Sequence, residues 1–288
     1  MDKVIKIVDE KRGIVQITVF NERWYAKPIR NISTGLPEYQ FVPSVSWIAG
    51  HYPKGIGFYK WLADRGWDEA ESIKQAAGDR GSKVHKAIED LILGNEVKKD
   101  SRYMSDLTGT AVELTWEEYE VIFSFTQWWN ETKPVPVLGE FTIWSDKHNY
   151  AGTVDLLCKI GEEWWLIDFK TGQNIWPEYE IQVSAYEECL PENSEVMEKL
   201  KEAGWKGELI KVGILQLGYK RNKKLFKFTE IEKKFNLFLA SKTMWTNECA
   251  NVSPRKIELP LSLTLVAPKK EEKPEEVKEE KKNVNVKL

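Results

Sequence analysis

The chain has 288 residues, of which 42% are hydrophobic and 12% aromatic, so it can bury the core of one large domain or of two small ones. Its formal net charge of −3 excludes a uniformly basic nucleic-acid-binding surface, although a local basic groove is compatible with it. Cys158, Cys189 and Cys249 form no CxxC pair, so neither a disulfide framework nor a zinc knuckle is predicted. Without a signal-peptide core or an 18-residue apolar window, we expect a cytoplasmic protein with no membrane partner.

The N-terminal part of the chain predicts a β-hairpin and a short helix. Apolar and polar residues alternate at 13–29, and we expect this hairpin to form an appendage of residues 1–40. Ser44 is suited to cap a short helix, which a Pro- and Gly-containing turn interrupts and which resumes at 58–65. Aromatic residues are dense from 47 to 61, and core packing is their expected role.

Two longer helices are predicted next. Asp68 is a plausible N-cap for the first, which runs to about residue 93. Residues 98–109 are polar and are expected to form a connection. Thr115 and Glu118 form a capping box for the second helix, which Pro134 follows.

The second half of the chain alternates strand-like and helical segments. The strand-like segments lie at 137–145, 151–161, 164–172, 208–219 and 224–231, and the helical ones at 177–190, 194–203 and 231–251. The first three strands are expected to form a meander, and Pro177 suits the first turn of a helix. These segments predict an α/β (α+β) fold with a central mixed sheet flanked by helices.

A charged tail ends the sequence. Residues 269–288 consist mainly of Lys and Glu and contain too few large apolar side chains to form a core. We therefore expect a main domain at residues 41–268, followed by disorder.

Charged residues interrupt the apolar strands of the meander. Side chains alternate in a strand, so Asp168 and Lys170 project on one side while Ile167 and Phe169 project on the other. If the neighbouring strand pairs with this one, Asp155 reaches the same surface as Asp168. Two carboxylates this close repel unless a positive charge lies between them.

Two arrangements can supply that charge. Lys170 can form a buried salt bridge, or a divalent cation can bind Asp155 and Asp168 and leave Lys170 for another task. Carboxylate ligands favour Mg²⁺ or Mn²⁺ over zinc, and His85 can complete the coordination. His85 and Glu89 are four residues apart on one helix face, although spacing alone favours a solvated pair.

Several motifs together resemble the PD-(D/E)xK nuclease superfamily, specifically its RecB-like branch as found in phage and bacteria. The resemblance spans residues 81–186, with a lead-in segment near Pro43, and depends on four elements in the expected order. They are G-S-K-V-H-K-A-I-E at 81–89, G-T-V-D at 152–155, I-D-F-K-T-G at 167–172 and Q-V-S-A-Y at 182–186.

This resemblance implies a restriction-endonuclease-like core and a metal-dependent DNA exonuclease. Such an enzyme hydrolyses phosphodiester bonds at DNA ends during recombination, repair or DNA degradation, in a bacterial cell or a phage-infected host. No iron-sulfur cluster is expected, because Cys158 lies in a strand and no group of three cysteines follows. The implied metal ligands are His85, Asp155, Asp168 and the backbone carbonyl of Phe169, the implied catalytic lysine is Lys170, and the implied positioning residues are Gln182 and Tyr186.

Two glutamates are second-rank candidates for the same site. Glu140 can approach the metal surface from the first strand of the meander, although a solvent-facing position is equally compatible with the pattern. Glu89 can orient or neutralise a neighbour of His85, and the candidates are Arg80 and Lys86.

DNA contact is expected to be electrostatic and salt-dependent. Trp176 and Trp144 can stack on a displaced base, although core packing is the expected role of both. The best-defined basic cluster is the turn that contains Lys220, Arg221, Lys223 and Lys224.

Three other functions fit parts of the pattern. The chain can be a nuclease-fold scaffolding subunit whose tail recruits a helicase or annealing partner, although the intact acidic residues and lysine argue against this. A structure-specific endonuclease is compatible with the same motifs. A carboxylate-pair glycosidase is disfavoured, because that chemistry has no role for a strand lysine beside the carboxylate.

Overall fold

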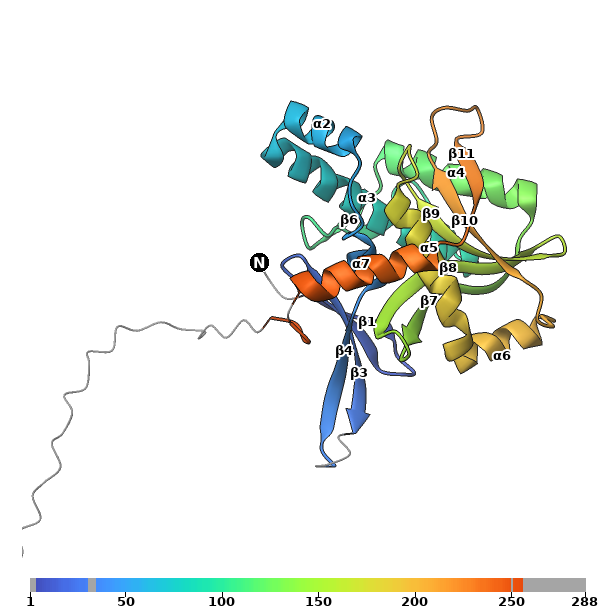
Figure 1. Ribbon diagram of the computed structural model, residues 1–288. Helices are drawn as coiled ribbons and strands as arrows, with labels where there is room; N and C mark the ends of the chain where they lie inside the picture. The colour runs from blue at the N-terminus through green and yellow to red at the C-terminus, as the bar shows by residue number, and fades with distance from the viewer. Residues whose placement is uncertain (1–3, 31–34, 250, 256–288) are drawn as a thin grey trace, which may run out of the picture. The chain divides into compact units, whose positions relative to one another are not determined.

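The computed structural model describes residues 4–30, 35–249 and 251–255, which form a mixed α/β structure on a central five-stranded sheet (Figure 1). The strand order is β11-β10-β9-β8-β7; β9 and β10 are parallel and the other neighbours are antiparallel. The predicted mixed sheet and its meander are thereby confirmed. The strands are β7 (Val135–Ser145), β8 (Tyr150–Ile160), β9 (Glu163–Lys170), β10 (Ile210–Leu217) and β11 (Phe226–Ile231).

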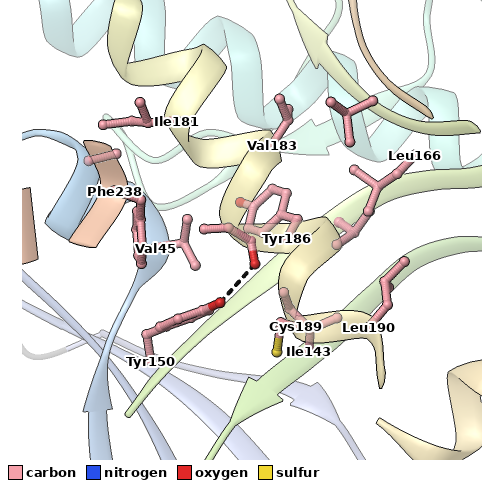
Figure 2. Packing of buried hydrophobic residues seen from close by; sticks show 14 of the residues in the cluster. Val45, Ile143, Tyr150, Leu166, Ile181, Val183, Tyr186, Cys189, Leu190 and Phe238 are labelled. Carbon is pink, nitrogen blue, oxygen red and sulfur yellow. Dashed lines mark hydrogen bonds between the residues drawn. The ribbon is translucent and has the colours of Figure 1, made fainter. Parts of the chain in front are cut away.

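Helices cover both faces of this sheet. Leu156 and Leu157, neighbours on β8, point into different hydrophobic clusters because successive strand residues face opposite sides. One cluster lies under α1, α5 and α7, where the Tyr150 hydroxyl donates to the Ala185 carbonyl at 2.9 Å (Figure 2). The other lies under α3 and α4. The helices are α1 (Val45–Ala49), α2 (Ile56–Arg65), α3 (Trp67–Ile92), α4 (Trp116–Thr132), α5 (Pro177–Cys189), α6 (Ser194–Glu202) and α7 (Phe235–Glu248), with a 3₁₀ turn at Leu190–Glu192.

The parallel pairing of β9 and β10 requires a crossover, which α5 and α6 supply. As a result, the carboxyl ends of β9 and β10 lie at the same edge of the sheet. Lys170, the last residue of β9, is therefore placed near the turn that follows Leu217.

The predicted N-terminal hairpin is part of a larger sheet. It forms the central pair of the four-stranded order β1-β2-β3-β4, and the two outer strands were not predicted. Ile17 and Trp24 of this sheet belong to the same buried cluster as α1 and α7. The boundary at residue 40 stays a prediction. The strands are β1 (Val4–Asp9), β2 (Ile14–Val19), β3 (Glu22–Arg30) and β4 (Pro37–Pro43).

Local capping signals were informative, with one exception. The Ser44 side chain accepts from the Trp47 amide at 3.1 Å, and Thr115 forms the predicted capping box, because these caps satisfy free amides at helix starts. Asp68 is not an N-cap, since α3 begins one residue earlier after Gly66, whose φ of 79° favours glycine.

The connection predicted at residues 98–109 contains the first strand and the turn of a further small hairpin, whose second strand lies beyond it. The hairpin is formed by β5 (Arg102–Met104) and β6 (Ala111–Glu113). In the described part of the chain, no helix is long and apolar enough to cross a membrane. The tail predicted to be disordered, residues 269–288, lies outside the described residues.

Candidate active site

The site begins where the β8–β9 ladder ends. The last paired residues are Leu156 and Ile167, and one further step in this register places Asp155 opposite Asp168. The main-chain pairing stops here because the Asp155 carboxylate takes the next amide: Oδ2 accepts from the Phe169 N–H at 2.6 Å. The two carboxylates consequently lie where the strands diverge, as predicted for neighbouring strands.

Lys170 lies on the same side of β9 as Asp168. Its Nζ atom is 2.6 Å from Asp168 Oδ2, and Ile167 and Phe169 point into the opposite cluster under α3 and α4. The predicted strand alternation is therefore confirmed. Lys170 Nζ also lies 4.6 Å from the ring centroid of Tyr179, which offers a cation–π contact.

His85 reaches the site from α3, on the other face of the sheet. Its Nδ1 atom lies 3.0 Å from Asp155 Oδ1, across a separation of 70 residues in sequence. Val84 and Ile88 are fully buried against the sheet and thereby fix the rotation of α3 that directs His85 to the carboxylate. The helix stripe was visible in the sequence, whereas the contact with Asp155 depends on packing.

Gln182 and Tyr186 join the cluster from α5. The Gln182 amide nitrogen donates to Asp168 Oδ1 at 3.3 Å and to the Tyr186 hydroxyl at 2.7 Å. Its carbonyl oxygen accepts from Lys170 Nζ at 3.4 Å. One buried amide thus contacts both the acid and the lysine, and the positioning role of this pair stays a prediction.

The surroundings shift the pKa values of the two aspartates in opposite directions. Burial raises the pKa of Asp155 in isolation, but the nearby His85 and Lys170 charges and the Phe169 amide outweigh it and hold that pKa below its ordinary value. Burial, reinforced by the charge of Asp155 and only partly offset by Lys170, raises the pKa of Asp168.

The same charges act on the two bases. Burial lowers the pKa of Lys170, but the charges of Asp168 and Asp155 outweigh it, so the net shift is upward and the side chain stays protonated near neutral pH. His85 behaves likewise, because the effect of Asp155 exceeds that of burial on its pKa. Lys170 is therefore a cation in this arrangement.

Glu140 and Glu89 face a small cavity beside Asp155. The cavity has a volume of about 10 Å³, room for one water-sized particle, and His85 also lines it. Glu140 has a φ of 35° and interrupts the β7–β8 pairing directly opposite Asp155. Strand periodicity did not determine which side of the sheet Glu140 faces, and the structure directs its side chain toward the site.

Lysines partly neutralise these two glutamates. Glu89 is ion-paired with Lys86, one of its two predicted partners, and Glu140 with Lys6 at 3.3 Å. The other predicted partner, Arg80, pairs instead with Glu117 at 3.2 Å.

The donor set suits a hard divalent cation. Within the described ranges, no group of three or more His, Cys, Asp and Glu side chains is arranged as a metal cage. Asp155 is instead turned toward His85 and the Phe169 amide. Asp168 Oδ2 lies 2.6 Å from Lys170 Nζ, and because a carboxylate oxygen carries two lone pairs, the ammonium leaves acceptor capacity for a further ligand. Carboxylate oxygens and one imidazole match the preferences of Mg²⁺ and Mn²⁺.

Gly152, in the G-T-V-D motif, has a packing role that was not recognised from the sequence. A Cβ atom there would lie 2.6 Å from Cε1 of Tyr186 and 3.2 Å from Cγ2 of Val45. The available signal was a glycine inside a strand, which often marks a close approach. Gly152 therefore provides the space in which Tyr186 supports Gln182.

Replacing Gly152 with alanine is expected to lower the free energy of unfolding by about 1–3 kcal/mol, because the new methyl group overpacks the Tyr186 ring. Urea denaturation measures the change. Gly78→Ala is the matched control: its Cβ meets nothing within 4 Å on α3, so alanine should stabilise the helix by about 1 kcal/mol. Equal effects of the two substitutions would contradict the proposed close contact.

The structure locates the basic turn and shows the burial of the two tryptophans that were considered for base stacking. The turn follows β10 at the Lys170 edge, and Arg221 donates to Asn174, in the loop after β9, at 3.0 Å. Trp144 is buried, which confirms core packing for this residue. Trp176 is 43% exposed, so core packing is wrong for it; it lies at the start of α5 rather than under the sheet.

No protein-family model matches the sequence, and a search of curated proteins finds no match.

Proposed function

We propose that this chain is a divalent-metal-dependent deoxyribonuclease of the RecB-like type, with a restriction-endonuclease-like core, that hydrolyses phosphodiester bonds at DNA ends. One observation carries the proposal: Asp155, Asp168 and Lys170 on two strands meet His85 from α3 and Gln182 from α5. A structural salt bridge needs only two partners, whereas five polar side chains converge in this cluster, which is typical of a functional site.

The residues suited to hold the cation are His85, Asp155, Asp168 and the Phe169 carbonyl. When bound, a divalent cation polarises a phosphate oxygen and lowers the pKa of a water molecule. The amide of Phe169 orients the Asp155 carboxylate, and burial against the sheet limits its freedom. These contacts preorganise the acidic side chains before substrate arrives.

Lys170 acts as a cation at the reacting phosphate. Because its pKa is raised, it offsets the negative charge that develops on the phosphorane and holds a water by donating a hydrogen bond. Gln182 fixes the lysine through its carbonyl oxygen, and Tyr186 fixes the Gln182 amide. This chain of contacts aims the ammonium group.

The proposal is tested by digestion of end-labelled DNA with Mg²⁺, Mn²⁺ or EDTA. Linear substrates should be degraded with either metal and remain intact in EDTA, because the carboxylates alone do not polarise a phosphate. Single-stranded, blunt, nicked and circular DNA are compared. Cleavage of closed circles would show an endonuclease rather than an exonuclease. Binding without cleavage of any substrate would favour a scaffolding subunit.

A further inference from the structure

An open groove of about 800 Å³ lies beside the catalytic cluster, between the α2–α3 hairpin and the first turn of α5. Most of its lining is apolar, and we call it the aromatic groove. Its volume is in the range typical of sites for organic ligands. Its aromatic members are Phe58, Trp61, Trp67, Trp176 and Tyr179.

Helical spacing directs these side chains into the groove rather than into a core. Phe58, Trp61 and Leu62 share one face of α2, yet this helix contains no buried residue. Trp67 at the start of α3 is 71% exposed. Large aromatic rings left open to water on one continuous surface indicate a surface that binds a ligand.

The groove leads directly to the catalytic lysine. The Tyr179 ring lines it and also lies 4.6 Å from Lys170 Nζ. Trp176 follows Lys170 by only six residues, at the N-terminal end of α5. Tyr179 therefore borders both Lys170 and the groove, so a strand with its phosphate at Lys170 can continue into the groove.

Basic side chains lie at the rim of the groove. Arg221 of the basic turn donates to Asn174, a lining residue, at 3.0 Å. Lys54 and Lys74 also line the groove, but each is paired with a glutamate of the same lining: Lys54 with Glu178, and Lys74 with Glu71 at 3.4 Å. Arg221 can therefore neutralise a phosphate at the rim, while the aromatic rings provide flat apolar faces for bases.

We propose that the aromatic groove binds the unpaired bases of single-stranded DNA adjacent to the scissile phosphate. Bases inside a duplex are stacked on both faces and offer no free face to a tryptophan, so the groove selects a free single strand. This inference depends on the proposed nuclease function, since it assigns the strand that enters that site.

The test is fluorescence anisotropy with a labelled oligo-dT and a blunt duplex of equal length, in EDTA so that binding is measured without cleavage. Trp67→Ala and Trp176→Ala should each weaken oligo-dT binding by about fivefold to 100-fold, the loss of one stacked base, and leave duplex binding unchanged. Trp116→Ala is the matched control: this tryptophan is 74% exposed on α4, outside the groove, and its loss should change neither affinity.

Two results would overturn the assignment. Unchanged oligo-dT affinity in both groove variants shows that the rings do not stack on bases, and an equal loss for the blunt duplex shows that the groove does not select a single strand. Circular dichroism of each variant verifies that it is folded, and Trp176→Phe, which keeps a ring, should retain most of the affinity.

Binding and cleavage are measured separately, so the groove and the nuclease function are tested independently. Groove-dependent binding of oligo-dT by a protein that cleaves no DNA with Mg²⁺ or Mn²⁺ supports the groove and rejects the nuclease. Cleavage by a protein whose groove variants bind oligo-dT normally rejects the groove and keeps the nuclease.

Discussion

Replacing Lys170 with alanine is expected to reduce metal-dependent DNA cleavage by about a thousandfold or more, because the substitution removes the cation aimed at the reacting phosphate. The measurement is the initial rate of digestion of end-labelled DNA at saturating Mg²⁺ or Mn²⁺. Lys211→Ala is the matched control, since this strand lysine pairs with Glu163 at 2.6 Å near the opposite end of β9 and should leave the rate unchanged. A Lys170→Ala variant with the wild-type rate would reject the proposed site.

The same substitution has a consequence for stability. Asp168 is almost completely buried, and without Lys170 its charge is unpaired, which costs about 3–5 kcal/mol. A divalent cation at the carboxylates replaces the missing charge, so Mg²⁺ should raise the melting temperature of Lys170→Ala more than that of the wild type. Lys170→Arg retains a positive charge but not the geometry, and it should keep the fold while losing most of the activity.

Replacing Lys83 with methionine is expected to lower the free energy of unfolding by about 3–5 kcal/mol. Lys83 is 6% exposed and lies 3.0 Å from Asp79 Oδ2 and 2.6 Å from Glu118 Oε1. Its loss leaves two carboxylates buried without a cation. The loss also loosens the attachment of α3 to α4, because Glu118 simultaneously caps the first turn of α4 through the Thr115 amide.

Thermal and urea denaturation measure this effect. For a domain of this size the melting temperature should fall by roughly 10 °C. The control is Lys199→Met, whose pair with Glu202 on α6 is exposed and should contribute at most about 1 kcal/mol. A change in Lys83→Met as small as in the control would show that the buried carboxylates are protonated or hydrated.

Local patterns were sufficient for much of the site. Alternation along β9 placed Asp168 and Lys170 on one side, and helical spacing placed His85 on a face with Glu89, because both periods are properties of the backbone. Caps such as Ser44 were also visible, since they satisfy amides within one helical turn. The prediction that Asp68 is the N-cap of α3 is wrong, because the actual N-cap, Gly66, is determined by the turn between α2 and α3.

Contacts between distant segments required the tertiary structure. His85 meets Asp155 only because the stripe of α3 packs on one face of the sheet while Gln182 of α5 approaches from the other. The end of the β8–β9 ladder depends on the Asp155 side chain replacing a backbone acceptor, which no propensity describes. The orientation of Glu140 follows from a left-handed backbone that strand periodicity does not anticipate.

The aromatic residues show the same division. Their density near α2 was evident from the chain, but core packing and ligand binding require the same residue types, so composition does not distinguish them. Only the packing of α2 decided that Phe58 and Trp61 line an open groove while Trp47, nearby in sequence, packs against Trp24 and Trp245. Period and capping are local and are encoded in short segments; burial is a property of the whole fold, because it depends on which distant surfaces meet.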